Sequence, residues 1–263
     1  MLLAIDAGNT NTVFALFEGK TLAGVWRTTT SVQHTTDEYA VFLKTLMAEA
    51  GLEPKKVTAA ILGSVVPDAN FHLLNLCRKH FNCEPLVVGS PEVSLGIKIN
   101  IDRPEEVGAD RLVNAISGAL TYKPPLLLID FGTATTFDVV DAKGNYCGGA
   151  IAPGINLSLQ ALHMAAAKLP RVGVARPQKV IGTNTVEAIK SGTFWGYTGL
   201  IEGMIGRIKA EFGQPLTVIA TGGLAPLFRD VIPAIEHIDA DLTLRGLYAI
   251  YERNKVGYVG NAG

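Results

Sequence analysis

An eleven-residue pattern occurs twice in this chain, and the duplication constrains the fold more than any other feature of the sequence. Residues 2–12 read LLAIDAGNTNT and residues 126–136 read LLLIDFGTATT, with six identities in a gapless alignment. Each copy predicts an apolar strand that ends in Asp-x-Gly, then a polar turn and a second apolar run. An internal repeat of this kind indicates that the same structural unit occurs twice in the chain. The alternative, two unrelated hairpins that share common residues, explains six matches less well.

The segments around the two copies follow the same plan. Each copy predicts three strands, at 2–6, 13–17 and 21–26 in the first and at 126–130, 137–140 and 146–151 in the second. Further strands are predicted at 57–65, 86–88 and 216–220, and helices at 35–50, 71–81, 102–122, 156–168, 185–212 and 242–253. The first helix opens on a capping box formed by Thr35 and Glu38. The alternation predicts an α/β protein with two similar halves, residues 1–112 and 113–263.

Composition excludes several classes of protein. The 263 residues are 48% hydrophobic and 18% charged, with a formal net charge of -1. A chain of this kind is neither disordered nor basic enough for a nucleic-acid partner. No segment predicts a membrane span or a secretory leader, and three scattered cysteines are typical of a reducing compartment. We therefore expect a cytoplasmic protein without a nucleic-acid or membrane partner.

Both Asp-x-Gly turns carry chemistry that suits phosphate. Gly8 permits close approach of the backbone, and neighbouring Asn and Thr residues supply hydrogen-bond donors. Asp6 can hold a phosphate through Mg²⁺ or its waters. Asp130 and Thr133 offer the same groups in the second copy, so two facing turns would hold a triphosphate. For a single turn, a tight hairpin that needs Gly and Asn for its shape is an equal alternative. No P-loop or dinucleotide fingerprint is present.

A third motif places an acid beside a base at the predicted start of a helix. Residues 106–111 read EVGADR, and a glycine at position 108 of a helix indicates that space is needed there. An ionised Asp110 could accept a hydroxyl proton, and Arg111 could pair with a carboxylate of the acceptor. A solvated surface pair is the default alternative.

Taken together, these motifs resemble those of type III pantothenate kinases over nearly the full length of the chain. The matching motifs are Asp6-Ala7-Gly8-Asn9-Thr10, Glu106-Val107-Gly108-Ala109-Asp110-Arg111, Asp130-Phe131-Gly132-Thr133-Ala134-Thr135-Thr136, Gly148-Gly149-Ala150-Ile151-Ala152-Pro153-Gly154 and Thr221-Gly222-Gly223. The resemblance implies an actin/hexokinase-like fold with two ribonuclease H-like halves. It also implies a homodimer and the ATP-dependent phosphorylation of pantothenate to 4′-phosphopantothenate, the first step of coenzyme A biosynthesis.

The resemblance also implies roles for particular residues. Asp110 would be the general base, and Asp130 would bind a monovalent cation, K⁺ or NH₄⁺. The implied ATP-binding residues are Asp6, Ala7, Gly8, Asn9, Thr10, Asn11, Thr12, Val13 and Thr133, with Mg²⁺ on the β- and γ-phosphates. The implied pantothenate-binding residues are Gly108, Ala109, Asp110, Arg111 and, from the neighbouring subunit, Thr185. Ile101 departs from the family, which often has Tyr there, so this position lacks the aromatic side chain that the resemblance would place over the substrate.

Two other functions stay open from the sequence. One is a kinase of the same fold with a different small acceptor, and the other is a nucleotide-binding regulator that phosphorylates nothing. Residues 183–212 carry more apolar side chains than one helix face needs, which fits either an internal core helix or a dimer interface.

Overall fold

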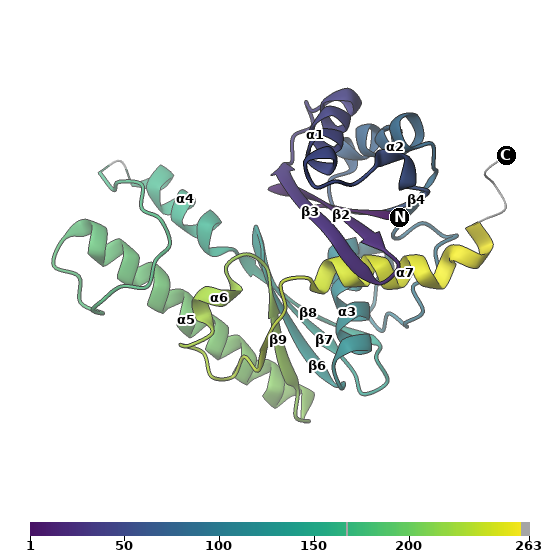
Figure 1. The fold of residues 1–263 in the computed structure, drawn as a ribbon. Coiled ribbons are helices and arrows are strands. Elements are labelled where there is room, and N and C mark those ends of the chain that lie inside the picture. The colour runs from purple at the N-terminus through teal and green to yellow at the C-terminus, as the bar shows by residue number, and fades with distance from the viewer. Residues whose placement is uncertain (167, 259–263) are drawn as a thin grey trace. The chain divides into compact units, whose positions relative to one another are not determined.

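The duplicated sequence folds into two duplicated sheets. The computed structural model describes residues 1–166 and 168–258, and these form two units that are interleaved along the chain (Figure 1). The first unit contains Met1–Lys98, Asp102–Ser117 and the described residues from Asp241 onward. The second contains Ile99–Ile101 and Gly118–Ala240. The chain therefore does not divide at one point into two continuous segments such as 1–112 and 113–263.

The first unit is built on a mixed five-stranded sheet with the order β3-β2-β1-β4-β5. Its strands are β1 (Leu2–Ala7), β2 (Asn11–Glu18), β3 (Thr21–Thr29), β4 (Ala59–Ser64) and β5 (Pro85–Val87). The first three pair antiparallel, whereas β4 and β5 continue the sheet in parallel with β1. Helices α1 (Thr36–Glu49) and α2 (Pro67–Phe81) cover one face of this sheet, and α3 (Ala109–Thr121) and α7 (Leu242–Tyr258) supply residues to the core on the other.

Strand β1 shows why both faces need a cover. Leu3 and Ile5 point into the core beneath α1 and α2, and Leu2 and Ala4 point into the core that includes α3 and α7. Successive side chains of a strand alternate between faces, so a strand without polar residues is stable only when both faces are buried. The apolar run predicted from the sequence is thus the central strand of the unit.

The second unit repeats this topology in the order β10-β9-β6-β7-β8. Its strands are β6 (Leu126–Phe131), β7 (Ala134–Val140), β8 (Tyr146–Pro153), β9 (Thr217–Thr221) and β10 (His237–Ile238). Three further helices belong to it, α4 (Ile155–Ala165), α5 (Thr185–Phe212) and α6 (Ala225–Phe228). Each strand has a counterpart in the first unit with the same neighbours and directions. The prediction of two similar α/β halves is confirmed.

The two hairpins differ in length by one residue, which the gapless alignment of the repeat missed. Ala7 pairs with Thr12 in the first hairpin, and Phe131 pairs with Thr135 in the second. Thr12 and Thr135 are both fully buried, whereas Thr136 is not. Thr135 is therefore the structural counterpart of Thr12, and the sequence match of Thr12 with Thr136 is wrong. A shift of one position reverses the face of every side chain, so burial decides the pairing.

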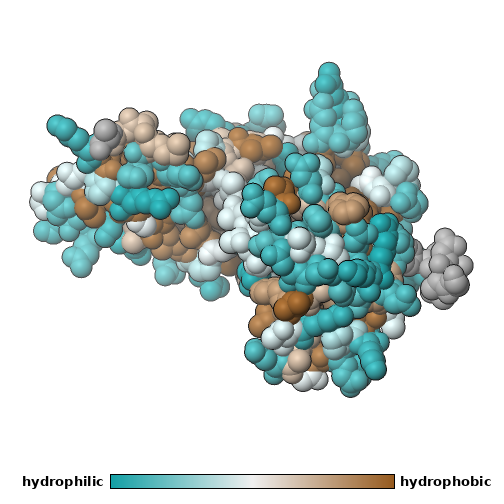
Figure 2. Space-filling model, turned by 90° about the horizontal axis from the view of Figure 1, so that it is seen from above, coloured by the Kyte–Doolittle hydropathy of each residue, from teal (hydrophilic) through white to brown (hydrophobic). Residues whose placement is uncertain are grey.

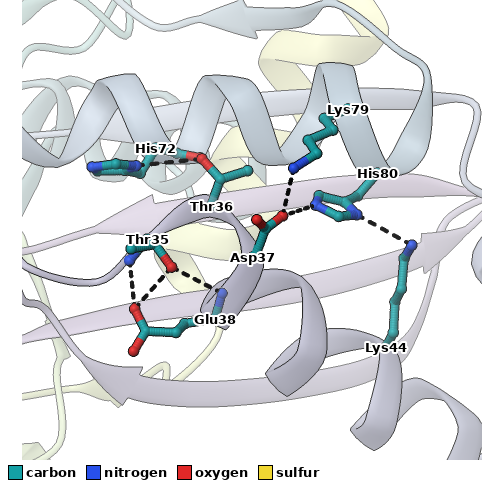
Figure 3. A network of polar contacts seen from close by, with 8 residues as sticks. All are labelled: Thr35, Thr36, Asp37, Glu38, Lys44, His72, Lys79 and His80. Atoms are coloured by element: carbon teal, nitrogen blue, oxygen red, sulfur yellow. Dashed lines mark hydrogen bonds and ion pairs between the residues drawn. The ribbon is translucent and has the colours of Figure 1, made fainter.

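The predicted capping box is present at the start of α1 (Figure 3). The Thr35 amide donates to Glu38 Oε2 at 2.7 Å, and the Glu38 amide donates to Thr35 Oγ1 at 3.3 Å. Nearby, Asp37 Oδ1 accepts hydrogen bonds from Lys79 Nζ and His80 Nε2 of α2, each at 2.8 Å. The bond from Lys79, followed by that from His80, lowers the pKa of Asp37. These contacts join α1 to α2 at the surface, where ion pairs contribute little stability.

Helix α7 packs closely against α3 within the first unit. Leu244, Leu247 and Ile250 of α7 join Val113 and Ile116 of α3 in one buried cluster. Thr243 Oγ1 also donates to Asn114 Oδ1 at 2.7 Å. A Cβ added at Gly246 would lie 2.3 Å from the carbonyl oxygen of Val113, so only glycine permits this approach. Within the described chain, no helix combines the length and apolar character that a membrane span needs.

Replacing Gly246 by Ala should therefore destabilise the protein. The new methyl group would force α3 and α7 apart, at a cost of about 1–3 kcal/mol. Calorimetry should show a lower unfolding temperature, by about 2–4 °C per kcal/mol for a chain of this size. Gly206→Ala is the matched control, because a Cβ added at this exposed position on α5 meets no atom within 4 Å. Equal unfolding temperatures for the two variants would contradict the packing described.

Candidate active site

The first Asp-x-Gly turn lies where β1 ends and β2 begins. Ala7 is the last residue of β1, and the turn between the paired residues Ala7 and Thr12 presents exposed Asn9, Thr10 and Asn11. The Gly8 amide closes the turn by donating to the carbonyl oxygen of Asn11 at 3.0 Å. Asp6 is partly exposed at the end of β1. The predicted ATP-binding residues of the first copy, Asp6 to Val13, thus form one continuous hairpin with a polar tip.

Thr30, which the sequence analysis missed, holds this turn from the side. Its amide donates to the carbonyl oxygen of Thr10 at 2.9 Å, and its hydroxyl donates to that of Gly8 at 2.6 Å. The hydroxyls of Thr30 and Thr12 lie 2.9 Å apart. Thr30 directly follows β3, and only the pairing of β3 with β2 brings it to the turn. Eighteen or more residues separate it from the groups it contacts, and no local pattern points to it.

The acid–base motif begins a helix at a different place from the one predicted. Pro104–Glu106 form a 3₁₀ turn, Val107 is extended with ψ 124°, and α3 begins at Ala109. The Gly108 carbonyl oxygen accepts hydrogen bonds from the amides of Arg111 and Leu112 at 3.1 and 3.3 Å. Gly108 therefore precedes the helix, and the predicted helix from 102 is wrong because the extended Val107 interrupts it.

This arrangement places the Asp110 carboxylate in the first turn of α3. Asp110 Oδ1 accepts a hydrogen bond from the Arg111 amide at 2.8 Å, and both residues are partly exposed. A Cβ added at Gly108 would lie 2.6 Å from that oxygen, so the glycine makes room for the carboxylate. The amide dipoles at the start of a helix also favour negative charge there. A partly exposed, oriented carboxylate of this kind can accept a proton from a ligand hydroxyl.

Val65 connects the first turn to the Asp110 segment. Its amide donates to the carbonyl oxygen of Ala7 at 3.0 Å, and its Cγ1 lies 3.5 Å from a Cβ added at Gly108. Because β1 and β4 run in parallel, their carboxyl ends meet at one edge of the sheet. The first unit thus brings the predicted phosphate turn and the predicted base to this same edge, which is where ligands bind in many α/β proteins.

The second Asp-x-Gly turn is packed against two glycines. A Cβ added at Gly154 would lie 2.3 Å from the Thr133 carbonyl oxygen and 2.6 Å from that of Gly132. Gly222, with φ +90°, approaches Asp130 Oδ1 and the Phe131 carbonyl oxygen, which a Cβ there would meet at 2.8 and 2.7 Å. The glycine motifs noted in the sequence therefore belong to the second turn. Gly222 brings backbone next to two oxygen atoms, one charged and one neutral, which suits a cation.

Thr185 lies in the second unit, at the first position of α5. Asn184 caps this helix by accepting a hydrogen bond from the Glu187 amide at 3.0 Å. Thr185 lines a groove of about 640 Å³ between α4 and α5. Apolar and small side chains make up most of its walls, which are formed by Ile155, Ser158, Leu162, Leu169, Thr185, Ala188, Ile189, Gly192, Thr193, Gly196, Tyr197 and Leu200. The second unit thus holds Asp130, Thr133 and Thr185, and the first holds the other predicted site residues.

The donor set fits a cation that arrives with a nucleotide. Across residues 1–166 and 168–258, no three His, Cys, Asp or Glu side chains are grouped as a metal site. Mg²⁺ bound to nucleotide phosphates needs only one or two carboxylates, because water and phosphate oxygens complete its shell. Asp6, partly exposed at the end of β1, can supply such a carboxylate.

Comparisons with known proteins show the family of the chain. The family model for type III pantothenate kinase matches residues 2–207. A type III pantothenate kinase of Paramagnetospirillum magneticum is 63% identical over 254 residues, covering 97% of this chain and 98% of the relative. One of Rhodospirillum rubrum is 59% identical over 255 residues, covering 97% and 99%.

A solved structure shows the same fold at low identity. The activator of the 2-hydroxyisocaproyl-CoA dehydratase from Clostridium difficile, solved with bound ADPNP, has a TM-score of 0.55 and 12% identity. The match covers 97% of this chain and 96% of that one. This likeness concerns the fold alone, whereas the family model spans both Asp-x-Gly turns and the Asp110 motif. On that match and the identity to curated relatives, the chain belongs to the type III pantothenate kinase family.

Proposed function

We propose that this chain transfers the γ-phosphoryl group of ATP to the primary hydroxyl of pantothenate, giving 4′-phosphopantothenate and ADP. The observation that carries the proposal is the family match over residues 2–207, a range that includes both turns and the Asp110 motif. The reaction opens coenzyme A biosynthesis. The geometry of the first unit supports it, because a polar turn and an oriented carboxylate lie at the same sheet edge.

Phosphoryl transfer depends mainly on position and charge, and each residue can be assigned a part on that basis. We assign the ATP phosphates to the turn from Asp6 to Val13 and to Thr133. Mg²⁺ on the β- and γ-phosphates would supply charge neutralisation, with Asp6 beside it. Asp110 accepts the proton of the pantothenate hydroxyl while that oxygen bonds to the γ-phosphorus. The bond from the γ-phosphorus to the bridging oxygen then breaks, and ADP leaves.

The acceptor is assigned to the residues around Asp110. Gly108 and Ala109 bring backbone close to the bound pantothenate, and the Arg111 guanidinium pairs with its carboxylate. Asp110 Oδ1 accepts a hydrogen bond from the Arg111 amide, and this bond restricts the orientation of the carboxylate, which supports the assignment. Thr185 is assigned to the site of the neighbouring subunit.

Steady-state turnover with pantothenate and Mg·ATP tests this proposal, with Asp110→Asn as the informative variant. The amide keeps the shape of Asp110 but cannot accept the proton, so kcat should fall by about 10²–10⁴-fold. Nucleotide affinity, measured by calorimetric titration, should stay within about twofold because the phosphate turn is unchanged.

The possible outcomes separate the alternatives. A variant as fast as the wild type removes Asp110 as the base. A wild-type chain that hydrolyses or transfers phosphate only with another acceptor has a different substrate, and one that binds ATP without any turnover is a nucleotide-binding regulator.

We further propose that Asp130 binds a monovalent cation, K⁺ or NH₄⁺, beside the phosphates. The Asp130 carboxylate and the Phe131 carbonyl oxygen both lie within 3 Å of a Cβ added at Gly222. These two oxygens could serve as ligands for a large monovalent cation, which is coordinated by oxygen atoms at longer distances than a small one. Gly222 permits the close approach because it has no Cβ, and its φ of +90° independently favours glycine.

Activity should then depend on the identity of the monovalent cation. At constant ionic strength, rates in K⁺ and NH₄⁺ buffers should be high, and the rate in Na⁺ alone should be much lower, because Na⁺ prefers shorter bonds to oxygen. Initial rates with saturating ATP and pantothenate check this directly. Equal rates in K⁺ and Na⁺ would remove the assignment of Asp130.

A homodimer is also proposed, formed through the region of α4 and α5. Several large apolar residues in this region are exposed, among them Met164, Val180 and Ile181 at 75%, 66% and 81%. Figure 2 shows such hydrophobic side chains, in brown, on the left of its view, where Figure 1 has α4 and α5. Added Cβ atoms at Gly192, Gly196 and Gly199 of α5 meet nothing within 4 Å. Exposed apolar surface of this kind is typical of an interface.

The shared site predicts complementation between two inactive chains. Asp110→Asn and Thr185→Val disable different residues, which in the proposal meet across the interface. In an equal, randomly exchanged mixture, about a quarter of all sites carry both wild-type residues, so activity should return to about that fraction. Light scattering should show a dimer. A monomer at working concentration contradicts the dimer, and no recovery despite proven exchange contradicts only the sharing of the site.

We place this activity in the cytoplasm. Cys77, Cys83 and Cys147 are all free thiols. Burial, with a smaller contribution from Glu84, raises the pKa of Cys83 to about 11, so this thiol resists oxidation at neutral pH. The free thiols suit a reducing compartment.

A further inference from the structure

The two Asp-x-Gly turns are closed by the same backbone hydrogen bond. In the first unit, the residue after β3 is Thr30, whose amide donates to the Thr10 carbonyl oxygen at 2.9 Å. In the second, the residue after β8 is Gly154, whose amide donates to the Thr133 carbonyl oxygen at 3.1 Å. Because each hairpin has the same strand neighbours, Thr30 and Gly154 occupy equivalent positions. The duplication therefore includes the contact that ties the third strand to the turn.

The side chains at these equivalent positions are different, and so is the way each turn is held. At Gly154, a Cβ would lie 2.3 Å from the Thr133 carbonyl oxygen, so the backbone itself closes against the turn. At Thr30, the turn leaves space for a side chain, and the hydroxyl fills it. That hydroxyl donates to the Gly8 carbonyl oxygen at 2.6 Å. The first turn is thus held by a side-chain hydroxyl, whereas the second is held by direct packing of the backbone.

The buried threonines beneath the turns show the same difference. Thr135 of the second hairpin bonds through its hydroxyl to that of Tyr197. In the first hairpin, the counterpart Thr12 lies 2.9 Å from the Thr30 hydroxyl instead. Tyr39 faces Thr12 and Ser31, yet its buried hydroxyl makes no hydrogen bond of ordinary geometry to the described residues. Thr30 thus gives the buried threonine of the first hairpin a hydroxyl partner that its counterpart Gly154 cannot supply in the second.

We propose that Thr30 is a positioning residue that shapes the first turn for phosphate without touching the phosphate itself. Its amide and hydroxyl bind the carbonyl oxygens of Thr10 and Gly8, and the Gly8 amide occupies that of Asn11. Carbonyl oxygens repel an anion, whereas amide hydrogens attract it, so hydrogen bonds that occupy these carbonyl oxygens within the protein weaken their repulsion of phosphate. A turn that is already ordered also loses less entropy on binding. This inference rests on the proposed role of the first turn in binding ATP.

Thr30→Val is the direct test, because valine keeps the shape and removes only the hydroxyl. KM for ATP, and Kd for the non-hydrolysable analogue ADPNP measured by calorimetry, should rise about 5- to 10-fold, the usual effect of one lost hydrogen bond. KM for pantothenate should not change, and the unfolding temperature of the ligand-free protein should fall by only a few degrees, about the cost of one lost internal hydrogen bond. Thr30→Ser restores the hydroxyl and should return the Kd for ADPNP to within about twofold of wild type. Thr21→Val, an exposed change at the far end of β3, is the matched control.

Each other outcome overturns the inference in a recognisable way. Unchanged affinity for ADPNP in Thr30→Val means that the hydroxyl does not shape the turn. An equal rise in the KM values for ATP and for pantothenate means a general structural role. Failure of Thr30→Ser to restore affinity means that side-chain volume, not the hydroxyl, matters. A wild-type chain that binds ADPNP but does not phosphorylate pantothenate contradicts the proposed function and leaves the Kd comparison for Thr30 fully informative.

Discussion

Burial of the two central strands on both faces is the constraint on which the rest of the structure depends. Strands β1 and β6 carry only apolar side chains until their last residues, because helices or further core residues cover each face. The first position at which a charge is tolerated is the carboxyl end, where Asp6 and Asp130 become partly exposed. The hydrophobic pattern that forms each sheet thus also fixes where the acidic groups stand.

Local patterns in the sequence predicted a large part of this fold. The repeat predicted both hairpins, since alternation of side chains and Gly-containing turns are local properties, and the capping box predicted the start of α1. Contacts between distant segments could not be predicted in this way. The packing of Gly246 on Val113, the position of Thr30 over Gly8 and the single-residue difference between the turns all depend on tertiary pairing. Gly108 was recognised as a space-making residue, but the extended Val107 that precedes it was not.

The glycines of the candidate site have a common physical role despite their different places. Gly108 leaves room for the Asp110 carboxylate, Gly154 for two carbonyl oxygens and Gly222 for the Asp130 carboxylate. In each case the missing Cβ brings an oxygen atom close to the backbone. A larger side chain at any of these positions would clash with a charged or polar group and not with the apolar core. The site is therefore more sensitive to added volume than its partial exposure suggests.

The interleaving of the two units has a consequence for how the chain is made. Residues 118–240 of the second unit are continuous, so all five strands of its sheet are available as soon as β10 leaves the ribosome. The first unit begins the chain, yet its core includes Leu244, Leu247 and Ile250 of α7, which is synthesised after every strand of both sheets. Translation runs from the amino end, but the amino-terminal unit is the last to complete its core. During synthesis, one face of the sheet in this unit is therefore not fully covered. The nascent chain must keep that face from other apolar surfaces until α7 has been synthesised.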